Sequence, residues 1–253
     1  MAAAPVPEPT DPRVPLAGRV ALISGASRGL GRALALRYSE AGATVVLCAR
    51  STRSLEDVAR GIRAGGGTAD AFSLDVTDAD AVEAMLREVR ARHGRLDVLV
   101  NNASLLGSRG PLAAQDPVEW RAVLDVNITG AFLLTRAALP LLRDSGGAVV
   151  NVSSGVGNRD RRDWGAYAVS KRALEAFSGN LALEEQAHGV RVNVVDPGRM
   201  RTGMRAAAYP EEDPATLPEP RDVTDVFVWL ASGASGGVTG QRFVAQDWSP
   251  DRT

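Results

Sequence analysis

The chain has 253 residues, a formal net charge of −1 and 45% hydrophobic residues, which suits a folded domain with a full apolar core. The near-neutral charge argues against an electrostatic nucleic-acid surface. No apolar stretch is expected to reach the roughly 20 residues that span a bilayer. With Cys48 as the one cysteine, no internal disulfide can form, which favours the reducing cytoplasm and a buried, unreactive thiol.

The N-terminal segment differs in composition from the rest of the chain. Residues 1–15 contain five prolines and lack the basic start of a signal peptide, so we expect a disordered tail. No linker or internal repeat divides residues 16–253, and these are expected to form a single domain.

Strand and helix patterns alternate along that domain. Short β-branched or aliphatic runs predict strands at 19–24, 44–48, 68–74, 96–100, 148–152, 190–195 and 241–245. Helical patterns lie between them, at 30–41, 54–64, 78–93, 118–143, 164–187 and 223–231. Asp78 is a good N-cap, the glycines at 65–67 end the second helix, and Pro140 is expected to kink or end the long helix. The alternation predicts an α/β fold, a doubly wound, Rossmann-like parallel sheet with helices on both faces.

A glycine-rich turn follows the first predicted strand and opens the first helix. Its sequence is Ser24-Gly25-Ala26-Ser27-Arg28-Gly29-Leu30-Gly31. Glycines here let the backbone approach a pyrophosphate, which the free N–H groups of the helix N-terminus can bind. The spacing differs from the commoner G-x-G-x-x-G, so its position between strand and helix carries the inference. The candidate cofactor contacts are Gly25, Ser27, Arg28, Gly29, Leu30 and Gly31.

The end of the second strand bears on the choice of cofactor. An acidic residue there would bind the ribose 2′-hydroxyl of NAD, but Ala49 fills that position and Arg50 follows it. Arg50 and Arg28 could both bind the 2′-phosphate of NADP, which favours NADP(H), with NAD(H) as the alternative. After the third strand, Asp75-Val76 could contact the adenine, or Asp75 could cap the next helix.

Lys171 is the one lysine among 29 lysine and arginine residues. It follows Tyr167 by four positions, so both side chains share one helix face. An ammonium beside the phenol would favour the ionised form, lower the pKa of Tyr167 and make it an acid and base near neutral pH. The alternative is a surface lysine on an amphipathic helix.

In their order, these residues resemble the short-chain dehydrogenase/reductase family, in its compact branch of about 250 residues. The resemblance extends from Gly18 to about Phe243. Its motifs are, in chain order, Ser24 to Gly31, Asn101-Asn102-Ala103, Asn127, Asn151-Val152-Ser153-Ser154, Tyr167 with Lys171, and Pro197-Gly198 with Thr202. Within the family the chain is similar to a poorly characterised bacterial subgroup, through Trp164-Gly165-Ala166-Tyr167 and the segment from Arg205 to Leu217.

The resemblance implies a catalytic set. Tyr167 would be the acid in carbonyl reduction and the base in alcohol oxidation, and Ser154 would hydrogen-bond the substrate oxygen. Strand alternation points the adjacent Ser153 to the other side. Lys171 would bind the nicotinamide ribose, and Asn127 would hold a water that links Lys171 to solvent. The remaining implied cofactor contacts are Asn102, Ala103, Pro197, Gly198 and Thr202, the last at the nicotinamide carboxamide.

The expected function is that of an NADP(H)-dependent oxidoreductase interconverting a small-molecule ketone or aldehyde and an alcohol. Alternatives are an NAD(H)-preferring dehydrogenase of the same family and a catalytically silent NADP-binding regulator. The roughly 50 residues after Pro197-Gly198 are too few for the substrate domain of the family's longer epimerases and dehydratases. No metal site is expected, since the chain has two histidines and one cysteine.

The partners and the substrate pocket are less constrained. The two long helices carry more apolar residues than one sheet face covers, so a homo-oligomer, tetramer or dimer, is expected. The expected pocket walls are Leu105, Leu106, the loop 155–163 and a lid at 199–220. The charged run 158–163 is either a solvated loop or an attractor of an anionic substrate.

Overall fold

The computed structural model describes residues 13–250, so most of the expected N-terminal tail lies outside the described residues. The described residues contain one sheet of seven parallel strands in the order β3-β2-β1-β4-β5-β6-β7. This order runs outward in both directions from β1, which is the doubly wound α/β fold that the sequence predicted.

The strands and helices follow the predicted alternation closely. The strands are β1 (Val20–Ser24), β2 (Thr44–Ala49), β3 (Ala69–Ser73), β4 (Val98–Asn101), β5 (Ala148–Val152), β6 (Arg191–Asp196) and β7 (Arg242–Val244). The helices are α1 (Gly29–Glu40), α2 (Thr52–Ala64), α3 (Ala79–His93), α4 (Pro117–Leu124), α5 (Gly130–Ser145), α6 (Gly165–Glu184), α7 (Gly203–Ala208) and α8 (Asp225–Ala231). Asp78 caps α3 and Gly65 ends α2, as expected.

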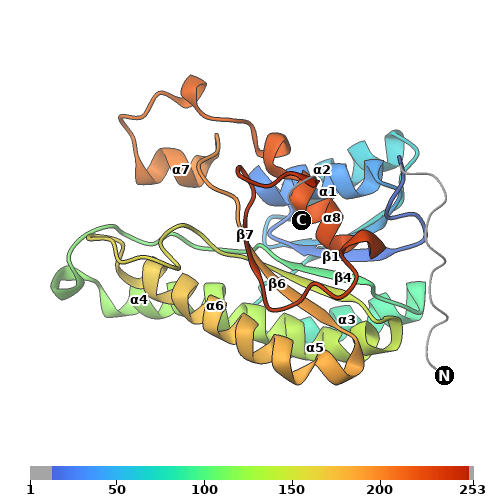
Figure 1. Cartoon of the computed structure of the whole chain (residues 1–253). Helices are drawn as coiled ribbons and strands as arrows, with labels where there is room; N and C mark the ends of the chain where they lie inside the picture. Colours follow the sequence, from blue (N-terminus) through green and yellow to red (C-terminus); the bar gives the residue numbers. More distant parts are fainter. Residues whose placement is uncertain (1–12, 251–253) are drawn as a thin grey trace.

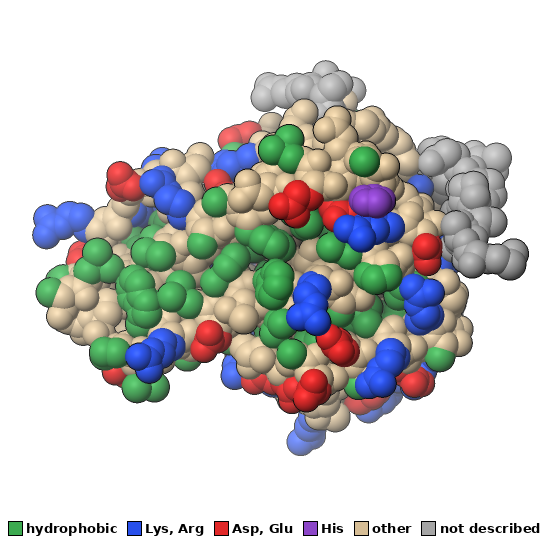
Figure 2. Space-filling model, turned by 90° about the horizontal axis from the view of Figure 1, so that it is seen from below, with side chains coloured by type: hydrophobic (Ala, Val, Ile, Leu, Met, Phe, Trp, Pro, Cys, Tyr) green, Lys and Arg blue, Asp and Glu red, His purple; other side chains and the backbone are tan. Residues whose placement is uncertain are grey.

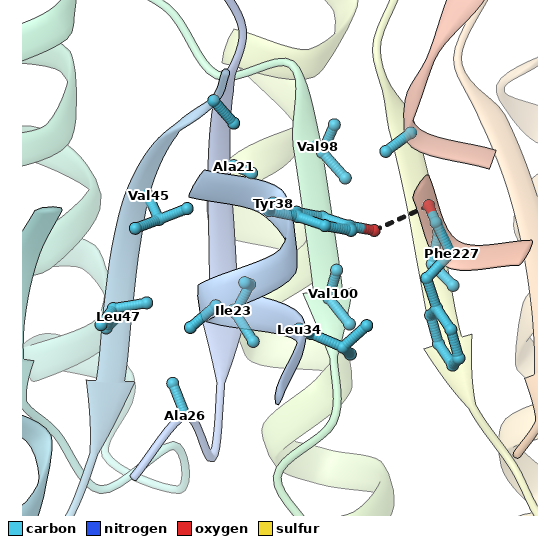
Figure 3. Close-up of a cluster of buried hydrophobic side chains, with 14 of the residues drawn as sticks. Ala21, Ile23, Ala26, Leu34, Tyr38, Val45, Leu47, Val98, Val100 and Phe227 are labelled. Carbon is cyan, nitrogen blue, oxygen red and sulfur yellow. Dashed lines mark hydrogen bonds between the residues drawn. The ribbon is translucent and has the colours of Figure 1, made fainter. Parts of the chain in front are cut away.

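Two helix layers enclose the sheet, and one short helix stands apart from both. Helices α1, α2 and α8 cover one face, while α3, α4, α5 and α6 cover the other (Figure 1). On the first face Tyr38 is buried among Ala21, Val98 and Val100, and its hydroxyl donates to the carbonyl of Phe227 at 2.9 Å (Figure 3). Helix α7 and the chain that follows it project from one edge of the molecule (Figure 1).

The long helical run after β4 differs from the prediction. It passes through Pro140 and continues to Ser145, so the proline does not end the helix. The irregularity lies earlier, in a π turn, η2 (Asp125–Thr129), between α4 and α5. By length and composition alone the 29-residue run Pro117–Ser145 could cross a membrane, which the sequence expectation missed. A helix layer packed on a sheet has the same apolar composition, and α5 packs its buried face on the core.

Strand register brings the carboxyl ends of the central strands level. Asn101 of β4 pairs with Asn151 of β5, and Val152 of β5 pairs with Val195 of β6. The residues that follow these strands therefore emerge at one edge of the sheet, where ligands bind in doubly wound folds.

Candidate active site

The turn between β1 and α1 packs closely on the residues that follow β4, which leaves no room for a side chain at two of its glycines. Gly25 and Gly29 have left-handed backbones, with φ of 66° and 55°. A Cβ on Gly25 would lie 2.9 Å from the Cα of Ala103, and one on Gly31 would lie 2.5 Å from Nδ2 of Asn102. Helix α1 begins with neither a side-chain cap nor an acidic residue in its first turn. Its N–H groups therefore suit a pyrophosphate, and the residues present fit a dinucleotide.

Asn102 and Ala103 support this turn from the neighbouring strand. The backbone N–H groups of Asn102 and Ala103 both donate to Oγ of Ser24, each at 3.0 Å. The Asn102 side chain donates to the carbonyl of Ser24 at 2.8 Å and to that of Gly25 at 3.3 Å. Asn102 thus fixes the shape of the turn, and its direct contact with a cofactor stays a prediction.

Two arginines flank the expected position of the cofactor's adenosine ribose. Arg28, directly before α1, and Arg50, directly after β2, are both exposed. Neither forms an ion pair with a carboxylate within residues 13–250. Ala49, in the position of an NAD-binding carboxylate, is buried. The guanidinium groups of both arginines are therefore free to bind a phosphate.

Asp75 has a local role that the sequence did not reveal. It accepts hydrogen bonds from the backbone N–H and the hydroxyl of Thr77, at 3.0 and 2.8 Å. These two bonds, with the charge of Arg50, hold the pKa of Asp75 below its usual range. Helix capping belongs to Asp78 instead, so of the two roles considered for Asp75 only the adenine contact remains, as a prediction. Val76 is buried and fills the space beside Gly130.

The segment after β6 returns to the glycine turn. The backbone N–H of Gly198 donates to Asp196 at 3.0 Å, and Gly198 has a left-handed backbone with φ of 74°. Thr202 caps α7 by accepting from the N–H of Arg205 at 3.2 Å. Its methyl group would lie 3.5 Å from a Cβ on Gly29. Pro197, Gly198 and Thr202 therefore reach the sheet edge that the sequence assigned to the cofactor.

Tyr167 and Ser154 form the centre of the site. Tyr167 lies in the first turn of α6, Ser154 follows β5, and their side chains are hydrogen-bonded. The hydroxyl of Ser153 instead donates to Glu175 at 2.5 Å. The two adjacent serines therefore point to different sides, as strand alternation predicted.

The pKa of Tyr167 differs in direction from the expectation. Burial raises it to about 12; the bond to Ser154 opposes the rise, and the charge of Asp196 adds to it. The prediction that Lys171 lowers the pKa of Tyr167 is wrong for the protein without its cofactor, because desolvation of the phenol has the largest effect. The phenol is therefore protonated at neutral pH, as a proton donor to a carbonyl must be.

Lys171 is a buried residue, which excludes the surface-lysine alternative. It is 2% exposed, and its Nζ donates to the carbonyl of Val152 at 2.8 Å. Nζ lies 5.6 Å from the ring centroid of Tyr167. Burial lowers the pKa of Lys171 to about 8. The ammonium thus remains largely charged at neutral pH beside the phenol.

Asn127 occupies the π turn η2 and ties two parts of the site together. Its amide donates to the carbonyl of Leu105 at 2.9 Å and to the hydroxyl of Ser170 at 2.9 Å. Its carbonyl oxygen accepts from the N–H of Leu105 at 2.7 Å. Single π turns are frequent at functional sites. The side chain joins the loop after β4 to the residue beside Lys171, while its role in holding a water stays a prediction.

Comparison with known proteins accounts for this arrangement. Residues 19–213 match the sequence model of the short chain dehydrogenase family. The chain belongs to the short chain dehydrogenase family. Its members include the uncharacterized oxidoreductase YciK of Escherichia coli K12, which is 40% identical over 232 residues, 90% of this chain and 92% of that protein.

Solved structures of similar family members agree with the fold. A putative short chain dehydrogenase from Escherichia coli CFT073, complexed with NADPH, has a TM-score of 0.90 and 40% identity, covering 93% of this chain and 100% of that one. Another, from Shigella flexneri 2a and complexed with NADP, has a TM-score of 0.90 and 39% identity, covering 92% and 99%.

The sequence did not predict a cluster of charged side chains that contacts the backbone of Ser154. Arg242 of β7 contacts Asp196 at 2.9 Å, Glu175 at 3.1 Å and the carbonyl of Ser154 at 3.4 Å. Glu175 in turn accepts the hydroxyl of Ser153. An aspartate directly before Pro-Gly was the available signal, but its arginine partner lies 46 residues away.

The segment 199–220, predicted to be a lid, contains α7 and lines an open pocket of about 310 Å³. The pocket lies between α7 and the segment that follows, lined by Arg205, Tyr209, Glu212 and Leu217 among others. None of Asn127, Ser154, Tyr167 and Lys171 lines it, so the pocket is separate from the predicted catalytic residues. Leu106, Met204, Tyr209 and Ala208 instead pack with Tyr167 in a small apolar cluster.

Proposed function

We propose that this short chain dehydrogenase is NADP(H)-dependent and interconverts a ketone or aldehyde and an alcohol. The observation that carries the proposal is the hydrogen-bonded Ser154–Tyr167 pair, with buried Lys171 beside it, at the sheet edge where the glycine turn lies. The unpaired Arg28 and Arg50 support NADP(H) over NAD(H), as do the two family members complexed with NADP and NADPH.

The side chains divide the chemistry in a simple way. The cofactor supplies or accepts the hydride. Tyr167 donates its phenolic proton to the carbonyl oxygen during reduction and takes a proton from the alcohol during oxidation. Ser154 donates a hydrogen bond to the same oxygen and stabilises the charge that develops on it. Lys171 binds the nicotinamide ribose, and Asn127 holds a water through which Tyr167 and Lys171 regain a proton.

The cofactor residues follow the same edge of the sheet. Gly25, Gly29 and Gly31, with Ser27 and Leu30, receive the pyrophosphate on the N–H groups of α1. Arg28 and Arg50 bind the 2′-phosphate, Asp75 and Val76 contact the adenine, and Thr202 holds the carboxamide. The rest of the cofactor-binding site is formed by Asn102, Ala103, Pro197 and Gly198.

A screen of NADPH oxidation tests this function. Ketones, aldehydes, quinones and 3-oxoacyl thioesters are offered at neutral pH, and turnover is followed with wild type and Tyr167→Phe. The variant keeps the ring but lacks the transferable proton, so kcat falls by about 10²–10⁴-fold while NADPH affinity changes little. A Tyr167→Phe enzyme at nearly the wild-type rate rules out the mechanism. NADPH binding without turnover of any carbonyl favours the silent regulator instead.

The cellular setting and assembly belong to the same proposal. Residues 16–253 act as one domain in the cytoplasm, and Cys48 takes no part, since it is buried and burial raises its thiol pKa to about 12. The active form is a homo-oligomer, a dimer or tetramer. Figure 2 shows apolar side chains gathered on the face of the molecule that carries α4, α5 and α6, which supports such a contact.

A further inference from the structure

One wall beside the catalytic tyrosine is built from alternating aromatic rings and guanidinium groups. The ring centroid of Trp164 lies 5.7 Å from that of Tyr167 and 6.0 Å from that of Tyr209. The Cζ of Arg109 lies 4.9 Å from both the Trp164 and the Tyr209 ring. Arg161 approaches the Trp164 ring at 5.8 Å. Three segments that are far apart in the sequence, at Arg109, at 161–167 and at Tyr209, thus meet around the Trp164 ring, which lies next to Tyr167.

Two of the three arginines at this wall carry a positive charge that no carboxylate of the described residues neutralises. Arg205, stacked on Tyr209 at 3.8 Å, forms a two-bond ion pair with Glu212, at 2.5 and 2.6 Å. Arg109 and Arg161 form no ion pair with a carboxylate in the described part of the chain. Arg109 uses one N–H on the carbonyl of Ala208, at 2.6 Å. A guanidinium has five donors, so most of those on Arg109 remain available.

A second observation at the same wall is an unpaired buried donor. Trp164 is 7% exposed, yet its indole Nε1 has no hydrogen-bond acceptor among residues 13–250. A buried N–H without a partner is costly, so this donor calls for an acceptor that the protein itself does not supply. The residue is held firmly, because Gly110 pairs with it in a β-bridge and donates to the carbonyl of Asp163 at 3.1 Å.

We propose that the substrate carries an anionic oxygen group, a carboxylate or a phosphate ester, a few bonds from its reacting carbonyl. The anion binds the free N–H groups of Arg109 and the indole N–H of Trp164, while the carbonyl oxygen meets Tyr167 and Ser154. Arg161 adds to the positive potential at the entrance. This substrate class rests on the proposed reduction at Tyr167 and makes Arg109 and Trp164 specificity residues.

The stacking of Arg109 suits this role. The adjacent Trp164 and Tyr209 rings both lie against the guanidinium, and its bond to Ala208 ties it to the end of α7. Little side-chain freedom is then lost when the anion binds, and planar two-bond recognition of a carboxylate or phosphate becomes possible. Because Ala208 belongs to the lid, the same arginine also links the anion to the position of α7.

Matched pairs of neutral and anionic carbonyl compounds test the proposal. The pairs are acetoacetate with methyl acetoacetate, levulinate with methyl levulinate, and dihydroxyacetone phosphate with dihydroxyacetone. We measure kcat/KM with NADPH, and by calorimetry the affinity of each compound for the NADP-loaded enzyme. The wild type prefers the anion of at least one pair by about tenfold or more, as expected for charge-assisted bonds. The pair that shows the preference identifies a carboxylate or a phosphate as the group recognised.

Variants then assign the preference to residues. Arg109→Gln lowers the ratio of anion to neutral kcat/KM by about tenfold, and Trp164→Phe, which keeps a ring but lacks the N–H, also lowers it. The control is Arg162→Gln, an exposed arginine of the neighbouring loop that stacks on no described ring, and it leaves the ratio unchanged.

The outcomes separate this proposal from the proposed function. Equal use of both members of every pair, equal loss in Arg109→Gln and Arg162→Gln, or no calorimetric binding of any anion overturns the anionic subsite. Continued Tyr167-dependent reduction of neutral carbonyls in that case leaves the oxidoreductase function intact. Absence of all carbonyl reduction, with Tyr167→Phe indistinguishable from wild type, overturns the function itself.

Discussion

At the residue scale, Lys171 is held in a buried position that destabilises its positive charge. Its ammonium is almost fully buried and faces a carbonyl oxygen and the ring of Tyr167, and no carboxylate among residues 13–250 forms an ion pair with it. Burial lowers its pKa from 10.5 to about 8. This difference corresponds to a cost to folding of about 3 kcal/mol while the lysine is charged. Such a cost is expected where a residue is kept for binding or chemistry.

We therefore expect Lys171→Met to stabilise the fold while abolishing turnover. Removing the buried charge stabilises the fold by about 3 kcal/mol, and losing the hydrogen bond to Val152 destabilises it by about 1 kcal/mol. The free energy of unfolding at pH 7 therefore rises by about 2 kcal/mol. Below pH 8 the lysine is protonated in both the native and the unfolded protein, so burying its charge destabilises the wild type by the whole amount. Between pH 8 and 10.5 the native lysine loses its proton, so the advantage of the variant shrinks as pH rises.

Urea unfolding at pH 7 and pH 10, without added NADP, measures this difference. Lys171→Arg serves as the matched control, because it keeps a charge in the same place and gains no stability. It should also lose activity, since the larger guanidinium cannot make the same point contact with the ribose. A methionine variant less stable than wild type at pH 7, or a fully active arginine variant, contradicts this view of Lys171.

At the element scale, β7 contributes through one side chain that joins three other elements. Arg242 bridges Asp196 at the end of β6 and Glu175 of α6, and also contacts the carbonyl of Ser154 after β5. The charge of Asp196 raises the pKa of Tyr167. Arg242 lies against the same carboxylate and offsets part of that effect. We infer that Arg242 positions Ser154 and limits the rise in the pKa of Tyr167 that Asp196 causes.

The pH profile of alcohol oxidation tests this positioning role. Oxidation needs the ionised phenol, so the midpoint of log(kcat/KM) against pH reports its pKa. Arg242→Gln exposes Tyr167 to the full charge of Asp196, and the midpoint moves to higher pH. Asp196→Asn removes that charge, and the midpoint moves to lower pH. Two midpoints that stay at the wild-type value would mean that the cluster is only structural.

The end of β2 carries the cofactor prediction. Ala49→Asp with Arg50→Ala places a carboxylate where the ribose is expected and removes a phosphate partner. Losing one charge-assisted bond costs roughly 1.5–3 kcal/mol, which is about 10- to 150-fold in affinity for NADPH. Arg28 remains, so some NADPH use survives. The measurement is the ratio of kcat/KM for NADPH and NADH, with Arg50→Ala alone as the control. A wild type that already prefers NADH, or an unmoved ratio, shows the assignment of Arg50 to be wrong.

Local rules explain which parts of the fold and site could be predicted. The alternating pattern, the cap at Asp78 and the opposite directions of Ser153 and Ser154 depend on a few neighbouring residues, and the structure agrees with each. The π turn at Asp125–Thr129 and the raised pKa of Tyr167 depend on how distant elements pack and desolvate each other. Spacing along the chain carries no information of that kind.

At the scale of the whole molecule, the two faces differ in how well they are covered. Figure 2 shows apolar side chains gathered on the face that carries α4, α5 and α6. Val118, Phe132 and Val169 are exposed large hydrophobic residues of these helices. Val118 is 73% exposed, and Phe132 packs edge-to-face on Phe177 of the neighbouring helix at 6.5 Å. Within the described residues the opposite layer, α1, α2 and α8, shows no exposed large hydrophobic side chain of this kind.

This asymmetry predicts that the α4–α6 face is covered by a second copy of the chain. A two-fold contact would place the same helices of both protomers together and bury the exposed rings and branched side chains. Phe132→Asp combined with Val169→Asp puts two charges into that contact, where desolvation without a partner is costly. Light scattering at micromolar concentration should show a dimer or tetramer for wild type and a monomer for the double variant. Ser54→Asp, an exposed change on α2 of the opposite layer, should leave the oligomer intact. A monomeric wild type, or an oligomer that tolerates both aspartates, would show that another surface or none makes the contact.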